Sequence, residues 1–117
     1  MNQRFFRKPS RNKYGAKKTI VGDIKFDSKK EAQRWIELQL LERSGEISNL
    51  RRQVRIDLMG QHRPLLTKTG RQMRLTIDFA YIEDGIEVLE DSKGMWTRDF
   101  EVRYAVALAM GLNLIVT

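Results

Sequence analysis

The pair Asp84-Gly85 lies between two runs in which apolar and polar residues alternate. An Asp-Gly pair in this setting is the strongest short-range signal for a β-hairpin, because a two-residue type I′ turn needs positive φ at both central positions. The sequence therefore predicts a hairpin that runs from Arg74 to Lys93 and folds back at Asp84-Gly85.

The register of this hairpin brings two acidic residues together. With a two-residue turn, Asp78 lies directly opposite Asp91, Lys93 lies opposite Thr76, and all four side chains share one face. Like charges in opposite positions destabilise a sheet, and a divalent cation would offset them. A three-residue loop would instead pair Asp78 with Glu90, and the sequence leaves that alternative open.

The other face of the hairpin is apolar and is expected to pack against a helix or the core. It comprises Leu75, Ile77, Phe79, Tyr81, Ile86 and Val88.

Elsewhere, residue periodicity and turn residues predict the order β-hairpin, α, β, β-hairpin, α, β. This is a mixed α/β sandwich in which one sheet supports two helices, and it forms a single domain over residues 14–117 after a flexible basic arm at 1–13. The further elements expected are strands at 18–21, 24–26, 53–58 and 112–117, a helix from Ser28 to Ser44-Gly45, and a helix from Thr97 or Asp99 to Met110.

Composition narrows the functional classes. The chain of 117 residues is 41% hydrophobic and 32% charged, which is typical of a globular protein. Without cysteine it can form neither disulfides nor thiolate metal sites. No apolar run approaches the roughly 20 residues that span a bilayer. A soluble protein in the cytoplasm is therefore expected, with no membrane partner. We also expect no small-molecule cofactor.

The net charge of +7 is concentrated near the N-terminus. A basic arm of this kind suits a nucleic-acid backbone, whereas a solvated tail or a contact to an acidic partner are the alternatives. Further basic residues lie in the loop at 60–72 and in the second predicted helix. The candidate nucleic-acid-binding residues are Arg4, Arg7, Lys8, Arg11, Lys13, Lys17, Lys18, Arg63, Lys68, Arg71, Arg98 and Arg103.

The acidic pair has the chemistry of a hard-metal site. Carboxylate ligands favour Mg²⁺ or Mn²⁺, and Lys93, two residues from Asp91 on the same predicted strand, would position or deprotonate an attacking water. The alternative is an ordinary Asp–Lys pair on a solvated sheet face. Glu31 would either complete a capping box with Ser28 or project toward the aspartates as a third acidic group. The single histidine, His62, argues against a His-based triad.

The pattern Asp78…Asp91-Ser92-Lys93 resembles the active-site motif of the PD-(D/E)XK nuclease superfamily, which is built on a restriction-endonuclease-like αβββαβ core. The resemblance implies that Asp78 and Asp91 bind the metal, that Lys93 assists the water, and that Glu31 completes the site from the first core helix. Ile77 stands where the superfamily usually has proline.

Longer segments are similar to a phage-associated family of small proteins assigned to that superfamily, over residues 13 to about 110. These segments are Lys13-Tyr14, Lys17 to Thr19, Phe26 to Ala32, Glu90 to Gly94, Leu50 and Gln53. By this resemblance Gln53 is an accessory site residue, although a strand amide with ordinary hydrogen bonds is equally consistent.

Several small members of the superfamily are dimeric Holliday-junction resolvases. The resemblance therefore implies a homodimeric, structure-selective endonuclease that cuts branched DNA, acting in the bacterial host cytoplasm if the chain is phage-encoded. The alternatives are a nicking or general DNA endonuclease of the same fold, or a non-catalytic nucleic-acid-binding module.

Overall fold

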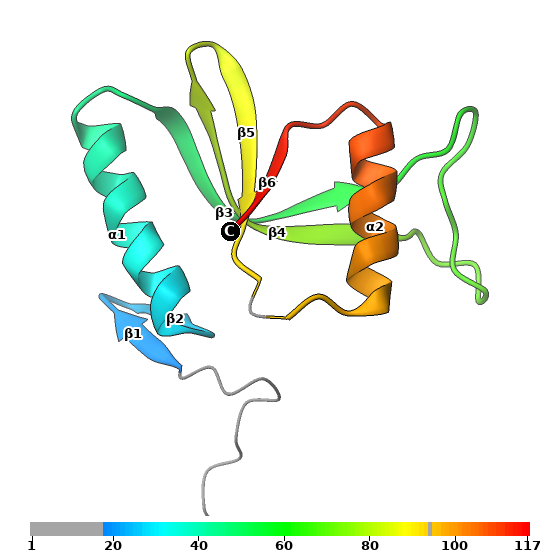
Figure 1. Cartoon of the computed structure of the whole chain (residues 1–117), viewed down its shortest axis with the longest axis horizontal. Coiled ribbons are helices and arrows are strands. Elements are labelled where there is room, and N and C mark those ends of the chain that lie inside the picture. The colour runs from blue at the N-terminus through cyan, green and yellow to red at the C-terminus, as the bar shows by residue number, and fades with distance from the viewer. Residues whose placement is uncertain (1–17, 94) are drawn as a thin grey trace, which may run out of the picture.

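A computed structural model of the chain describes residues 18–93 and 95–117, which form two sheets and two helices (Figure 1). Their order along the chain confirms the predicted mixed α/β fold, with a small hairpin before an αβββαβ core. The elements are β1 (Thr19–Val21), β2 (Ile24–Phe26), α1 (Lys29–Arg43), β3 (Ser48–Asp57), β4 (Arg74–Glu83), β5 (Ile86–Asp91), α2 (Arg98–Ala109) and β6 (Leu114–Val116).

The larger sheet has the spatial order β3-β4-β5-β6. Its first three strands are antiparallel neighbours, and β6 returns after α2 to lie parallel to β5. The small β1–β2 hairpin forms a separate two-stranded sheet beside α1.

The hairpin turn has the predicted geometry. Asp84 and Gly85 have φ values of 53° and 77°, as a type I′ turn requires. Glu83 pairs with Ile86 and Phe79 pairs with Glu90. The structure thus rules out the alternative register, which pairs Asp78 with Glu90.

The far end of the hairpin differs from the expectation. Strand β5 ends at Asp91, so the predicted pairing of Lys93 with Thr76 is wrong. The backbone N–H of Lys93 instead donates to the carbonyl oxygen of Thr117 at 3.1 Å, just beyond β6. The parallel strand β6 therefore draws this part of the chain away from β4.

Both helices begin and end with the expected local chemistry. The hydroxyls of Ser28 and Thr97 accept hydrogen bonds from the backbone three residues later, at 3.1 and 3.0 Å. Gly45 and Gly111, both at φ 87°, follow the C-terminal residues of α1 and α2 in the left-handed conformation that residues with a Cβ adopt only at a cost.

The alternation of side chains in β4 changes phase at Asp78. Leu75 and Ile77 pack in a cluster with residues of α2, whereas Phe79 and Tyr81 pack in a second cluster with Leu38 of α1. The prediction that these four β4 residues form one apolar face is therefore wrong.

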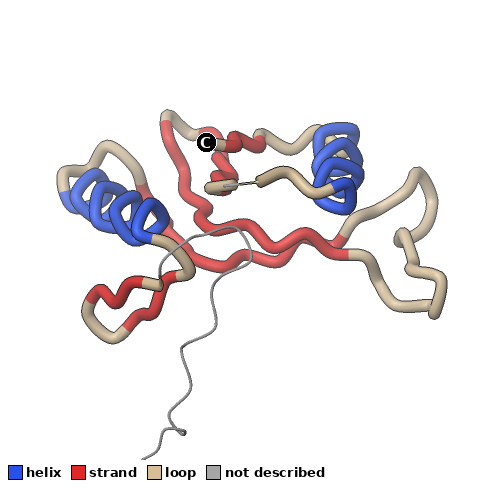
Figure 2. Tube along the Cα trace, turned by 60° about the horizontal axis from the view of Figure 1, so that its bottom comes forward, coloured by secondary structure: helices blue, strands red, loops and turns tan. Residues whose placement is uncertain are grey.

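Strand β3 changes phase at the same level. Val54 and Ile56 pack against the α2 cluster, but the guanidinium of Arg52 lies over the ring of Trp35 in α1. Gln53, between them, has the left-handed φ of 51°. Such an irregularity bends a strand and re-aims its side chains. Figures 1 and 2 show β3 and β4 bending strongly along their length.

The long connection between β3 and β4 projects beyond α2, at the end of the molecule away from α1 (Figures 1 and 2). Two isolated bridges, Met59 with Pro64 and Leu66 with Gln72, hold it in a narrow form. Within the described residues, no helix has the length and apolar character needed to cross a bilayer.

Candidate metal centre

Asp78 and Asp91 interlock across the two strands at the point where β4 changes phase. The backbone N–H of Asp78 donates to Oδ1 of Asp91 at 2.9 Å, and the N–H of Ser92 donates to Oδ2 of Asp78 at 2.8 Å. The Asp91 side chain is almost fully buried, with 3% of its surface exposed. The predicted juxtaposition of the two carboxylates is confirmed, and the backbone fixes it.

Burial makes both carboxylates hard to ionise, and the charge of Asp91 adds to this effect at Asp78. Burial first, and then the charge of Asp91, raise the pKa of Asp78 to about 7. Burial also raises the pKa of Asp91, although the N–H of Asp78 and the ammonium of Lys93 oppose that shift. The pair therefore holds a proton in a pH range where isolated aspartates have lost theirs.

Among the described residues, Lys93 is the cation that forms an ion pair with one of these carboxylates. Its Nζ lies 3.6 Å from Oδ2 of Asp91, an atom that is buried and accepts no hydrogen bond among the described residues. The same Nζ lies 4.4 Å from the ring centroid of Phe100 in α2. Lys93 thus reaches the site from the loop after β5 and not from the sheet face on which it was predicted.

Glu31 approaches the site from the first turn of α1, where it is 5% exposed. Its Oε2 accepts a hydrogen bond from Nε2 of Gln53 at 3.3 Å and lies 3.9 Å from the guanidinium of Arg52. Only the backbone N–H of Glu31 bonds to Ser28, so the carboxylate is free of the capping box. This position favours the second of the two roles considered for Glu31.

Electrostatics link Glu31 to the aspartates. Burial, then the neighbouring Asp27, and further the charge of Asp91 raise the pKa of Glu31, while Arg52 and Gln53 oppose the shift. Glu31 also contributes to the raised pKa of Asp78. Three acidic groups therefore share one electrostatic environment, with Gln53 bonded to one of them.

This donor set fits a hard divalent cation. Asp91 offers a buried carboxylate oxygen without a hydrogen-bond donor, and Asp78 and Glu31 supply further oxygens of the type that Mg²⁺ and Mn²⁺ prefer. In residues 18–93 and 95–117, no three acidic or imidazole groups already lie close enough to form a cation cage. Mg²⁺ commonly binds through one or two carboxylates and keeps several waters, so the pair Asp78 and Asp91 alone would be enough to hold it.

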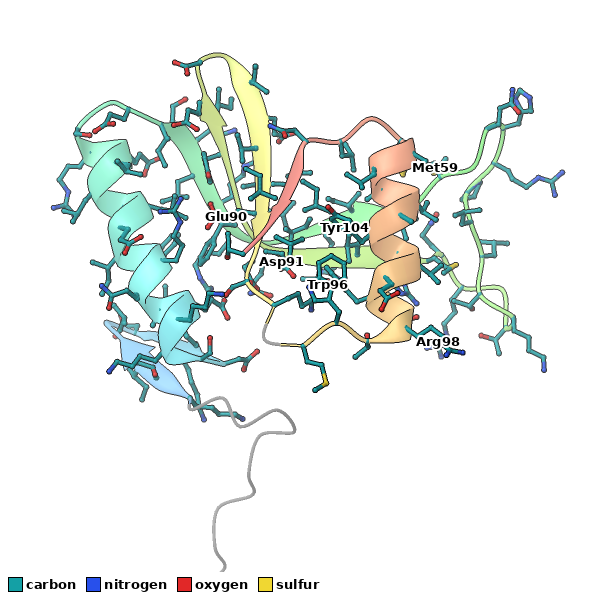
Figure 3. All side chains as sticks on the ribbon, viewed as in Figure 1. Met59, Glu90, Asp91, Trp96, Arg98 and Tyr104 are labelled. Carbon is teal, nitrogen blue, oxygen red and sulfur yellow. The ribbon has the colours of Figure 1, made fainter. Side chains whose placement is uncertain are left out.

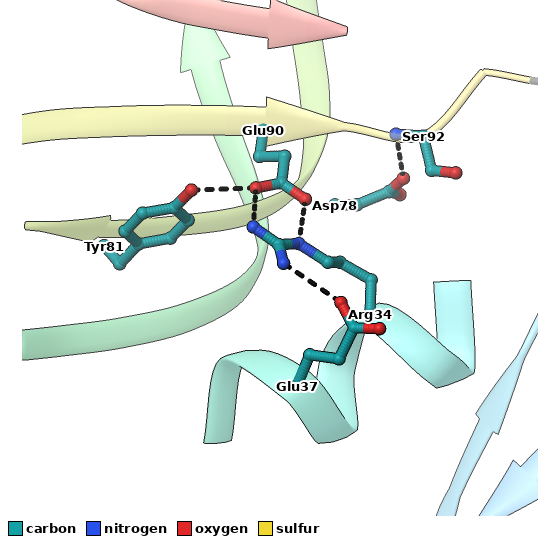
Figure 4. Close-up of polar contacts among 6 residues, drawn as sticks. All are labelled: Arg34, Glu37, Asp78, Tyr81, Glu90 and Ser92. Atoms are coloured by element: carbon teal, nitrogen blue, oxygen red, sulfur yellow. Dashed lines mark hydrogen bonds and ion pairs between the residues drawn. The ribbon is translucent and has the colours of Figure 1, made fainter. Parts of the chain in front are cut away.

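A second polar cluster, which the sequence reasoning missed, ties α1 to β5 next to the site (Figure 4). Nε and an Nη of Arg34 donate to the two oxygens of Glu90 at 2.7 and 3.0 Å, and the hydroxyl of Tyr81 donates to Glu90 at 2.8 Å. Hydrogen bonding to Glu90 raises the pKa of Arg34, and burial raises the pKa of Tyr81 to about 12. One feature of the sequence pointed to this cluster. Glu90 lies two residues after the apolar Val88, so both side chains were expected on the same face of the strand, and that face is buried.

The predicted nucleic-acid-binding residues do not all lie together. Arg98 opens α2, and Arg103, one turn later in that helix, bonds to Asp99 and to the carbonyl oxygen of Arg74. Arg63, Lys68 and Arg71 are exposed on the projecting loop beyond α2. Lys18 is exposed just before β1. The other arm residues, Arg4, Arg7, Lys8, Arg11, Lys13 and Lys17, lie outside the described residues, as does the predicted flexible arm at 1–13.

A pocket of about 360 Å³ opens beside the acidic site, between α1 and the end of β5. Lys30, Gln33 and Arg34 line it from the helix, and Ser92 lines it from the strand side. Since the N–H of Ser92 is bonded to Asp78, the pocket and the carboxylate pair share a border. Lys30 and Gln33 are polar groups at this border that the sequence did not single out.

Comparison with known proteins gives one match. No curated protein and no solved structure matches the chain. The matched family model extends over most of both sheets and both helices, including Glu31, Asp78, Asp91 and Lys93. The match covers residues 11–109 of the chain, and the chain therefore belongs to the family described as "Protein of unknown function (DUF1064)".

Proposed function

We propose that this protein is a Mg²⁺- or Mn²⁺-dependent endodeoxyribonuclease that hydrolyses phosphodiester bonds. The observation that carries the proposal is the interlocked pair Asp78 and Asp91, held by backbone hydrogen bonds with one buried carboxylate oxygen left without a donor. Facing buried acids with raised pKa values are typical of functional sites, which supports the proposal.

In this proposal Asp78 and Asp91 hold the metal and Glu31 extends its ligand set. When bound, the ion supplies positive charge to the phosphate oxygens and acidifies a coordinated water. Gln53 orients the Glu31 carboxylate through its hydrogen bond. The backbone N–H of Ser92 keeps Asp78 turned toward its partner.

Lys93 acts on the nucleophile. Its Nζ, beside Asp91, donates a hydrogen bond that orients a water for in-line attack on phosphorus and offsets negative charge in the transition state, while the proton that the water loses passes to solvent. The new P–O bond forms as the bond to the leaving oxygen breaks, and that oxygen is protonated by solvent. The products are one phosphate monoester end and one hydroxyl end.

We further propose that the substrate is branched DNA, such as a Holliday junction, and that the enzyme acts as a homodimer in the cytoplasm of a bacterial host. A domain of this size has little surface for reading a long base sequence, so shape recognition by two subunits suits it better. Two active sites would then cut two strands.

The test compares the wild-type protein with Asp91→Asn on four-way, flapped, duplex and single-stranded DNA in Mg²⁺ and in EDTA. We expect wild-type cleavage in Mg²⁺, strongest on branched DNA, and loss of cleavage by at least about a hundredfold in the variant. The matched control is Glu87→Gln, an exposed acid on the same strand that pairs with Arg51 and should cut like the wild type.

The substrates also separate the alternatives. Cleavage of all duplexes alike would indicate a general or nicking endonuclease of the same fold. Salt-sensitive DNA binding by a wild-type protein that cuts none of the four substrates would reject catalysis and favour a binding module. Cleavage by Asp91→Asn at the wild-type rate would show that Asp91 is not needed for catalysis and would overturn the proposed site.

A further inference from the structure

An exposed tryptophan stands at the entrance to α2. Trp96 is 43% exposed, and the adjacent Met95 is 51% exposed. The indole centroid lies 4.9 Å from that of Phe100 and 5.0 Å from that of Tyr104, at interplanar angles of 76° and 81°. Phe100 and Tyr104 are themselves stacked 5.9 Å apart. Trp96 therefore packs edge-to-face against this pair of rings while a large part of the residue stays exposed to solvent.

This aromatic cluster connects Trp96 to the acidic site. Phe100, which contacts the indole, also carries the ammonium of Lys93 above its ring at 4.4 Å, and that ammonium lies 3.6 Å from Asp91. Only one ring therefore separates Trp96 from Lys93. In the view of Figure 3, Trp96 lies between Asp91 and Arg98.

Charged side chains of both signs lie near the indole. Arg98 begins α2 two residues after Trp96 and is exposed, Lys93 lies one ring away, and Asp99 and Glu101 are acidic residues in the first turn of the helix. A ring backed by other rings, with an exposed arginine two residues away and next to the proposed hydrolytic centre, matches the way proteins bind single-stranded nucleic acid, in which bases stack on aromatic faces and cations contact the phosphates. In this arrangement Arg98 would contact the phosphate next to the stacked base.

We propose that Trp96 is a stacking platform for an unpaired DNA base next to the phosphate that is cut. Within a duplex the faces of each base are covered by its neighbours, whereas a base at a branch point or in a single strand exposes one. The platform thus supplies a reason for preferring branched or single-stranded DNA over continuous duplex. It rests on the proposed nuclease function for its biological role, and its test depends on binding alone.

The test uses the fluorescence of Trp96 in a Trp35→Phe background, which removes the other indole of the chain. The protein is titrated in EDTA with a short oligothymidine strand and with an abasic strand of the same length and charge. We expect the oligothymidine to quench the fluorescence strongly and the abasic strand to leave it almost unchanged. Trp96→Ala should weaken oligothymidine binding, measured by anisotropy, about tenfold and leave abasic binding unaltered.

Three controls test whether a change in binding comes from loss of the aromatic ring at position 96. Trp96→Phe keeps a stacking ring and should retain most of the affinity, while Met95→Ala removes an equally exposed apolar side chain without a ring and should bind like the wild type. Thermal unfolding checks that each variant is folded. Equal quenching by both strands, or unchanged oligothymidine affinity in Trp96→Ala, would overturn the platform.

The result is separable from that of the nuclease test. A protein that cuts no DNA but shows base-dependent quenching would retain the platform and lose the catalytic proposal. A protein that cuts branched DNA while Trp96→Ala binds and cuts it like the wild type would retain the catalysis and lose the platform.

Discussion

The two facing aspartates oppose folding of the chain when both are ionised. The folded-state pKa of Asp78 is about 7, against 3.8 for the group in its usual state. Between these values the folded chain holds a proton that the unfolded chain has released. The free energy of unfolding therefore falls as the pH rises through this window and levels off above it.

Replacing Asp78 with Asn should consequently stabilise the metal-free protein at alkaline pH. The amide oxygen can still accept from the N–H of Ser92, while the repulsion with Asp91 is gone. We expect Asp78→Asn to be more stable than the wild type by about 1 to 3 kcal/mol at pH 8, with little difference at pH 4. Urea unfolding in EDTA at both pH values measures this.

Thermal unfolding of the same two proteins tests whether the site binds a cation. Adding Mg²⁺ at pH 8 should raise the melting temperature of the wild type and have little effect on Asp78→Asn, because the ion binds only the ionised pair. Asp57→Asn changes an exposed aspartate of β3 and serves as the control, since it should respond to Mg²⁺ like the wild type. A destabilised Asp78→Asn at pH 8 would contradict the raised pKa.

Not every residue of the site was predictable from the sequence. The Asp78–Asp91 pair follows from the Asp84-Gly85 turn, because a two-residue turn fixes the register of the strands. The left-handed conformation of Gln53 has no such signal, since glutamine is not a residue that favours positive φ. Strict alternation consequently failed at the level of Gln53 and Asp78, where the sheet bends.

At the scale of elements, a half-buried ion pair joins α1 to β5 beside the apolar cluster that contains Leu38 and Val88. Arg34 lies one helical turn after Glu31, and Glu90 immediately precedes Asp91. The two hydrogen bonds from Arg34 to Glu90 therefore hold α1, which carries Glu31, against β5, which carries Asp91. Glu90 is 2% exposed, and its removal from water is balanced by Arg34 and Tyr81.

Removing Arg34 alone should therefore be costly. Arg34→Met leaves Glu90 buried without a counter-charge, and we expect a loss of about 3 kcal/mol, of which the double variant Arg34→Met/Glu90→Gln recovers a substantial part. The matched control is the exposed pair Arg51–Glu87, whose contact is also 2.7 Å but whose loss should change stability by less than about 1 kcal/mol. Equal losses in Arg34→Met and in the control variant Arg51→Met, measured by urea unfolding, would contradict this account.

The elements themselves were largely predictable, because their signals are local. Ser28 and Thr97 cap the helices, Gly45 and Gly111 end them, and the pairing of β4 with β5 follows from the Asp84-Gly85 turn. The contacts between elements were not, since the pairing of Arg34 with Glu90 joins residues 56 positions apart and leaves no periodic trace in the sequence.

At the scale of the whole molecule, the net positive charge is concentrated in the first 17 residues of the sequence. Residues 1–17 contain six basic residues and no acidic one, so a chain that starts at Lys18 keeps only one of the seven formal net charges. The described cations of the projecting loop, Arg63, Lys68 and Arg71, lie beyond α2 and away from α1. The DNA-binding hypothesis thus divides into two regions that can be removed separately.

Removal of residues 1–17 should weaken DNA binding without altering the chemistry. If the arm neutralises phosphates, the slope of log K against log salt becomes shallower by as much as about 5 for duplex DNA, equally for all sequences, while cleavage at saturating DNA keeps its rate. The comparison variant Arg63→Gln/Lys68→Gln/Arg71→Gln removes charge from the loop alone. A larger effect in this variant than in the truncated chain would place the main phosphate contacts on the loop beyond α2. An unchanged salt slope in both would leave these contacts to Lys30, Arg34 and Arg98 around the site itself.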